Sequence, residues 1–104
     1  MRSAASILSP LGLLLLASCA GTALQDRDLI GLSGPAVKET LGDPARVRHE
    51  ASTEIWQYAG PACVLDVFLY AEKGGSAVVH VEARDLEGRK ADSRRCLGSL
   101  TKTT

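Results

Sequence analysis

The chain has 104 residues, and its 12 lysines and arginines balance its 12 aspartates and glutamates. A formal charge of zero argues against the basic surface that nucleic-acid binding needs. The length allows one small domain and leaves no room for a second. The core of so small a domain is marginal, and such domains often depend on a covalent cross-link.

The chain opens with an apolar leader. Arg2 gives it a positive start, and the apolar stretch 7–17 is shorter than the ~20 residues of a membrane-spanning helix. The leader ends in a motif that resembles the lipobox of bacterial lipoproteins, Leu16-Ala17-Ser18-Cys19. We therefore expect 1–18 to be a lipoprotein signal peptide and Cys19 to carry the acyl chains of a membrane anchor. An ordinary signal peptide and a retained membrane helix are the alternatives.

The rest of the chain divides into three predicted segments: a lipidated tether at 19–26, a folded domain at 27–100 and a frayed tail at 101–104. Ala20 follows the lipobox cysteine, where an aspartate would favour retention in the inner membrane of enteric bacteria. We therefore expect a protein anchored in the outer membrane and facing the periplasm.

Three cysteines occur in the chain, and the anchor uses one of them. Cys63 and Cys96 remain, an even pair in an oxidising compartment, which favours a disulfide. Such a bond would close a loop of about 34 residues and stabilise the domain by roughly 3–4 kcal/mol in the chain-entropy model. A metal or redox site is the alternative, although no CxxC motif is present and neither histidine lies at a ligand-like spacing.

Sequence features typical of helices occur at both ends of the predicted domain. Residues 26–30 favour a brief helix or turn. Ser33 as N-cap, Pro35 in the first turn, Gly42 after the last turn and Pro44 beyond it predict a two-turn helix between them. Near the C-terminus, Asp92-Ser93 is expected to cap a short helix over 94–100 that places Cys96, Leu97 and Leu100 on its apolar side.

Three or four strands are predicted between these helices, at 46–50, 53–58, 63–70 and 77–84. Lys73-Gly74-Gly75 marks a hairpin turn, and the short connections require antiparallel pairing. In the last strand, Val79, Val81 and Ala83 are expected on one face. The predicted fold class is α+β: two short N-terminal helices packed on a three- to four-stranded antiparallel sheet, with a short C-terminal helix.

The stretch 29–58 resembles the SmpA/OmlA (BamE-like) family of outer-membrane lipoproteins. The resemblance rests on Gly31-Leu32-Ser33, Val37, Leu41-Gly42-Asp43-Pro44 and Trp56-Gln57-Tyr58, with later matches at Phe68-Leu69-Tyr70 and Val78-Val79-His80-Val81. It implies two short helices on a three-stranded antiparallel sheet and a role as an accessory lipoprotein of the β-barrel assembly machinery. The cysteine pair and the last helix are not part of the core family pattern.

A binding face is the functional hypothesis that the strands favour. Cys63 and its alternate neighbours should face the helices, and Phe68 and Tyr70 should point away from them. If Trp56 and Tyr58 join Phe68 and Tyr70, the four aromatics form a contact patch for a protein partner. The alternative is that Trp56 and Phe68 fill a thin core. Asp66 is expected to meet water, or else to pair with an arginine such as Arg84 or to mark the binding surface.

No catalytic constellation, cofactor motif or metal site is evident, so we expect a non-enzyme without a cofactor, a metal or a small-molecule substrate. His80 is expected to be an exposed or half-exposed strand residue rather than a catalytic base. His49 is expected to be solvated. The leading functional prediction is a periplasm-facing, protein-binding lipoprotein. The alternative is an inhibitor-like or envelope-stress lipoprotein that binds an enzyme or a cell-wall component.

Overall fold

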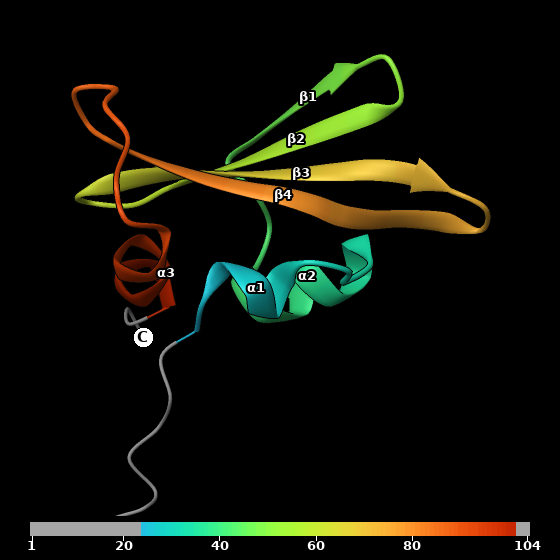
Figure 1. Ribbon diagram of the computed structural model, residues 1–104, viewed down its shortest axis with the longest axis horizontal. Helices are drawn as coiled ribbons and strands as arrows, with labels where there is room; N and C mark the ends of the chain where they lie inside the picture. Colours follow the sequence, from blue (N-terminus) through green and yellow to red (C-terminus); the bar gives the residue numbers. More distant parts are fainter. Residues whose placement is uncertain (1–23, 102–104) are drawn as a thin grey trace, which may run out of the picture.

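The computed structural model describes residues 24–101, so the predicted signal peptide and Cys19 lie outside the described residues. Three helices and four strands follow one another along this part of the chain (Figure 1). They are α1 (Asp26–Leu29), α2 (Gly34–Leu41), β1 (Arg46–Glu50), β2 (Thr53–Ala59), β3 (Cys63–Glu72), β4 (Gly75–Asp85) and α3 (Ser93–Thr101).

Both ends of α2 are set by the residues that the sequence singled out. The Ser33 hydroxyl accepts a hydrogen bond from the backbone N–H of Ala36 at 3.3 Å, which satisfies one of the free donors of the first turn. Gly42 ends the helix with a φ of 85°, a left-handed conformation that favours glycine, and its N–H donates to the carbonyl of Lys38. The predicted two-turn helix is confirmed.

The four strands form one antiparallel sheet in the order β1-β2-β3-β4. Each strand therefore pairs with its neighbour in the sequence. All three helices lie on the same side of this sheet (Figure 1). We call that side the helix face and the other side the open face.

The hydrophobic core lies between the helix face and the helices. Along β3, Cys63, Leu65, Val67 and Leu69 are all buried, as the alternation of strand side chains requires. Leu29 of α1, Val37 of α2 and Leu97 of α3 are each fully buried against the same cluster. Each helix thus contributes at least one apolar side chain to a single core.

The alternation predicted for β4 fails near its start. Val81 and Ala83 are buried as expected, but Val79 is 51% exposed and Val78 takes its place in the core at 1%. The cause is a register shift opposite Phe68 and Leu69, which inserts one extra residue into β4. Such a bulge reverses the faces of all residues on one side of it.

The described residues thus form an α+β fold with a four-stranded antiparallel open sheet and a C-terminal helix, as the sequence predicted. The N-terminal part matches the prediction less well, because α1 is a single turn of four residues beside the eight-residue α2. Within residues 24–101, no helix is long and apolar enough to cross a membrane.

Candidate functional site: the open face and the disulfide hollow

The strand register divides the four aromatic residues between the two faces of the sheet. Trp56 pairs with Val67 and Tyr58 with Leu65, and residues paired across strands share a face. Trp56 and Tyr58 are therefore on the helix face, where they are only 7% and 5% exposed. The prediction of a contact patch built from all four aromatics is wrong for these two, because β2 places them in the core.

Both buried aromatics are held by polar contacts. The Trp56 indole N–H donates to the Glu54 carboxylate at 2.8 Å, and the Lys38 ammonium lies 5.5 Å from the centre of the ring. The Tyr58 hydroxyl donates to the carbonyl of Gly42 at 2.9 Å. Burial, with a smaller contribution from the Asp43 carboxylate, raises the pKa of Tyr58 to about 12, so the phenol remains a donor at neutral pH. These contacts are structural.

The open face keeps the other two aromatics and adds a residue that was not predicted. Phe68 is half-buried, with its ring centre 5.2 Å from that of His80, and Tyr70 is 48% exposed. Ile55 pairs with Phe68 and is therefore on the open face, yet it is only 3% exposed and lies outside the main core cluster. His80 is exposed on the strand as predicted. The centre of the open face is thus partly apolar, and no helix or strand among residues 24–101 covers it.

A buried ion pair lies beside this apolar centre. Asp66 is only 4% exposed, and its carboxylate accepts from the Arg84 guanidinium at 2.7 Å and from the Gln57 side-chain amide at 3.2 Å. The expectation that Asp66 meets water is wrong, and the alternative pairing with Arg84 is found. Gln57 was missed, since only the register of β2 on β3 places it opposite Asp66.

Removal of Arg84 is expected to destabilise the fold. In Arg84→Met the Asp66 carboxylate keeps only the Gln57 amide as a partner. Breaking a fully buried pair typically costs 3–5 kcal/mol, and the 38% exposure of the Arg84 side chain reduces the expected cost to about 2 kcal/mol. Urea denaturation measures it. In the control Arg84→Met/Asp66→Leu, most of the loss should be recovered, and equal losses in both variants would contradict a paired carboxylate.

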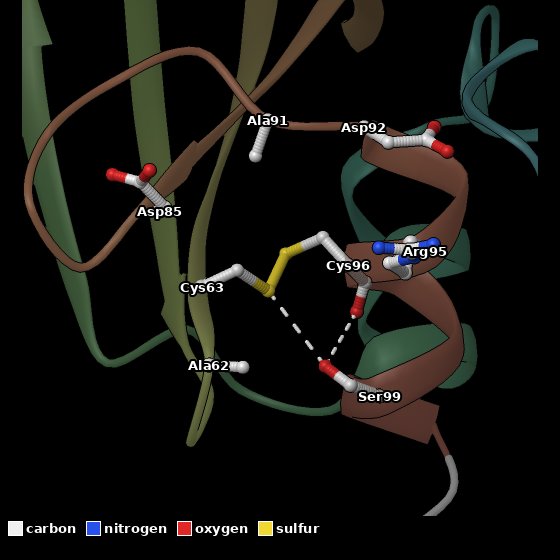
Figure 2. A pocket seen from close by; sticks show the side chains of 8 residues that line it. All are labelled: Ala62, Cys63, Asp85, Ala91, Asp92, Arg95, Cys96 and Ser99. Carbon is white, nitrogen blue, oxygen red and sulfur yellow. Dashed lines mark hydrogen bonds between the residues drawn. A yellow bond between two sulfur atoms is a disulfide. The ribbon is translucent and has the colours of Figure 1, made fainter.

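A second feature is a hollow beside Cys63 and Cys96 (Figure 2). Their sulfur atoms are at bonding distance, 1.99 Å, and join β3 to α3. The hollow has a volume of about 340 Å³ and opens between α3 and the loop after β4. Its remaining lining residues are Ala62, Asp85, Ala91, Asp92, Arg95 and Ser99.

The polar groups of this hollow are mostly engaged within the chain. The Ser99 hydroxyl donates to the Cys96 carbonyl at 2.9 Å and lies 3.7 Å from the Cys63 sulfur. The Asp85 carboxylate accepts from the backbone N–H of Arg89, which lowers the pKa of its carboxyl group. No histidine lines the hollow, and no group of three or more metal-ligating side chains gathers among residues 24–101.

The described residues define a class: a disulfide-linked α+β domain in which three helices pack on one face of the sheet, while no described element covers the other, partly apolar face. Comparisons with known proteins add nothing to this, since no family model, curated protein or solved structure matches the chain. The resemblance to the SmpA/OmlA family rests on sequence motifs alone and stays a prediction.

Proposed function

We propose that this chain is a lipid-anchored, non-enzymatic binding module of the bacterial envelope, and that the open face of its sheet contacts a protein partner. The observation that carries the proposal is the contrast between the two faces. Three helices pack on the helix face, whereas on the open face Phe68 is half-buried and Tyr70 is exposed. Uncovered apolar surface on a small domain typically marks an interaction site.

The ion pair of Asp66 and Arg84 adds a fixed polar group to this surface, beside its apolar centre. Both oxygens of the Asp66 carboxylate have partners, so the pair holds its geometry before any partner arrives. Arg84 keeps 38% of its side chain exposed and so presents donors to a partner. Aromatic side chains and an arginine on the same face match the composition of binding hot spots.

The proposed anchor supplies the rest of the mechanism. Acyl chains on Cys19 would confine the domain to the periplasmic surface of the outer membrane, where a tether of only a few residues raises its effective concentration near envelope proteins. The SmpA/OmlA resemblance suggests a subunit of the β-barrel assembly machinery as the partner. In that role the domain would bind its partner without catalysing a reaction.

Photo-crosslinking from the open face tests this function. A photoreactive amino acid in place of Tyr70 is expected to crosslink to a β-barrel assembly subunit in intact cells. The same amino acid in place of Glu39, which is exposed on α2, is the matched control and should give no such product. Crosslinking to a hydrolase or to cell-wall material from Tyr70 would instead support the inhibitor-like function, and equal products from both positions would contradict a binding face.

The same cells test the anchor separately. Cys19→Ala is expected to lose incorporation of labelled palmitate and to leave the membrane fraction or remain unprocessed. Unchanged membrane attachment would overturn the lipid anchor while leaving the open-face result intact.

A further inference from the structure

The two edge strands of the sheet, β1 and β4, differ in how much other segments of the chain cover them. At the β4 edge, Val78 forms two backbone hydrogen bonds with residues 31–32. The Gly31 N–H donates to the Val78 carbonyl at 2.8 Å, and the Val78 N–H donates to the Leu32 carbonyl at 2.9 Å. Further along, Ala91 N–H donates to the Ala83 carbonyl at 2.9 Å. Segments before α2 and before α3 thus pair with this edge around Val78 and around Ala83.

The β1 edge has no such cover within residues 24–101. All five of its residues are exposed, and beyond its pairing with β2 it makes no backbone hydrogen bond to any other described residue. The two-residue turn after Glu50 makes Glu50 and Thr53 a hydrogen-bonded pair. Hydrogen-bonded and non-hydrogen-bonded pairs alternate along antiparallel strands, so the backbone N–H and C=O groups of Val47 and His49 point away from β2. An edge strand with free N–H and C=O groups is a template for another strand.

We propose that β1 pairs antiparallel with β1 of a second copy of this chain, about a two-fold axis at Arg48. In this register Val47 lies opposite His49 of the second copy, so the outward backbone groups of both residues meet. Arg46 lies opposite Glu50 of the second copy, and the same pairing is repeated across the axis. The result is a continuous eight-stranded sheet with an isologous interface.

The charged residues of β1 favour pairing with a second copy of the chain. Arg46 makes no ion pair among the described residues, and Glu50 has only a 4.0 Å contact with Arg48. Antiparallel pairing gives each Arg46 a carboxylate at cross-strand distance and thus two new ion pairs per dimer. The two Arg48 side chains meet at the axis, where the Glu50 carboxylates partly offset their repulsion.

The register also aligns the binding surfaces of the two copies. Arg46 pairs with Gln57 and Arg48 with Ile55, so both arginines belong to the open face. Continuing the sheet across β1 therefore joins the two open faces into one surface of twice the area. The pairing itself depends on the strand edge and not on the proposed anchor or envelope partner, so it can hold if either of those proposals fails.

A charge-swap series tests the register. Sedimentation equilibrium of the purified full chain in mild detergent should show a monomer–dimer equilibrium. Arg46→Glu and Glu50→Arg, each alone, should weaken the dimer by about tenfold, because each places like charges opposite one another. The double variant Arg46→Glu/Glu50→Arg should restore the affinity to within about threefold of the parent value. Glu39→Arg, on α2, is the matched control and should change nothing.

Three results would overturn the proposal. One is a parent chain that stays monomeric at every accessible concentration, which would mean that the charges of β1 keep the edge free. The second is a dimer whose affinity does not change in either single charge-reversal variant. The third is a double variant whose dimer is as weak as the dimer of either single variant, which would mean that a residue other than Arg46 lies opposite Glu50. Should a reversal disturb folding, the parent dimer still has to weaken as salt is raised, and a salt-independent dimer contradicts the ion pairs.

Discussion

Loss of the bond between Cys63 and Cys96 is expected to lower the free energy of unfolding by about 3–4 kcal/mol. The two cysteines are 33 positions apart, so the bond removes a large amount of conformational freedom from the unfolded chain. The folded domain has little to replace it, because α3 adds only Leu97 and the bonded Cys96 as buried residues. The loss is a large share of the stability of a domain of this size.

Urea denaturation with and without reductant measures this effect, in a Cys19→Ala background so that no third thiol interferes. Cys63→Ala/Cys96→Ala should denature at the same lowered midpoint as the reduced parent. Mass mapping under non-reducing conditions is the independent check. Free thiols at both positions in protein purified from cells, or a midpoint that reductant does not move, would contradict a structural disulfide.

Trp56→Ala is expected to lower the free energy of unfolding by about 3–5 kcal/mol, the usual cost of removing a buried aromatic side chain. The ring is close enough to α2 that a β-carbon added at Gly34 would lie 3.3 Å from it. The substitution therefore leaves a cavity between helix and sheet and removes the contact with Lys38. Thermal and urea denaturation measure the change.

Tyr70→Ala is the matched comparison on the opposite face. Since Tyr70 is 48% exposed and its side chain makes no hydrogen bond to another described residue, its loss should change stability by no more than about 0.5 kcal/mol. It should instead reduce binding to the proposed envelope partner. A large destabilisation in Tyr70→Ala, or a small one in Trp56→Ala, would contradict the assignment of the two residues to different faces.

Local patterns were enough to predict much of the fold. Ser33, Gly42 and Pro44 delimit α2 because caps and stops act on the nearest turn of the backbone. The alternation of β3 correctly placed Cys63 and Leu65 on the helix face. In both cases the information lies within a few residues of the structure that it determines.

Features that depend on how strands align could not be predicted from the same patterns. The face of Trp56 follows from its pairing with Val67, eleven positions later, and the sequence does not state that register. Val79 was misplaced because a bulge of one residue reverses the alternation, and nothing local marks it. Asp66 was expected at the surface because Arg84 and Gln57, which cover it, lie 18 and 9 positions away.

The bond that joins β3 to α3 is also expected to keep the domain in one piece after a proteolytic cut. Two exposed turns lie between its cysteines, at Lys73-Gly74 and at 86–90. Such turns are where proteases cut first. A single cut at either one leaves both fragments covalently joined, with β3 and α3 still attached to each other. In the proposed envelope location, where proteases are expected, a molecule nicked in this way would keep its two halves together.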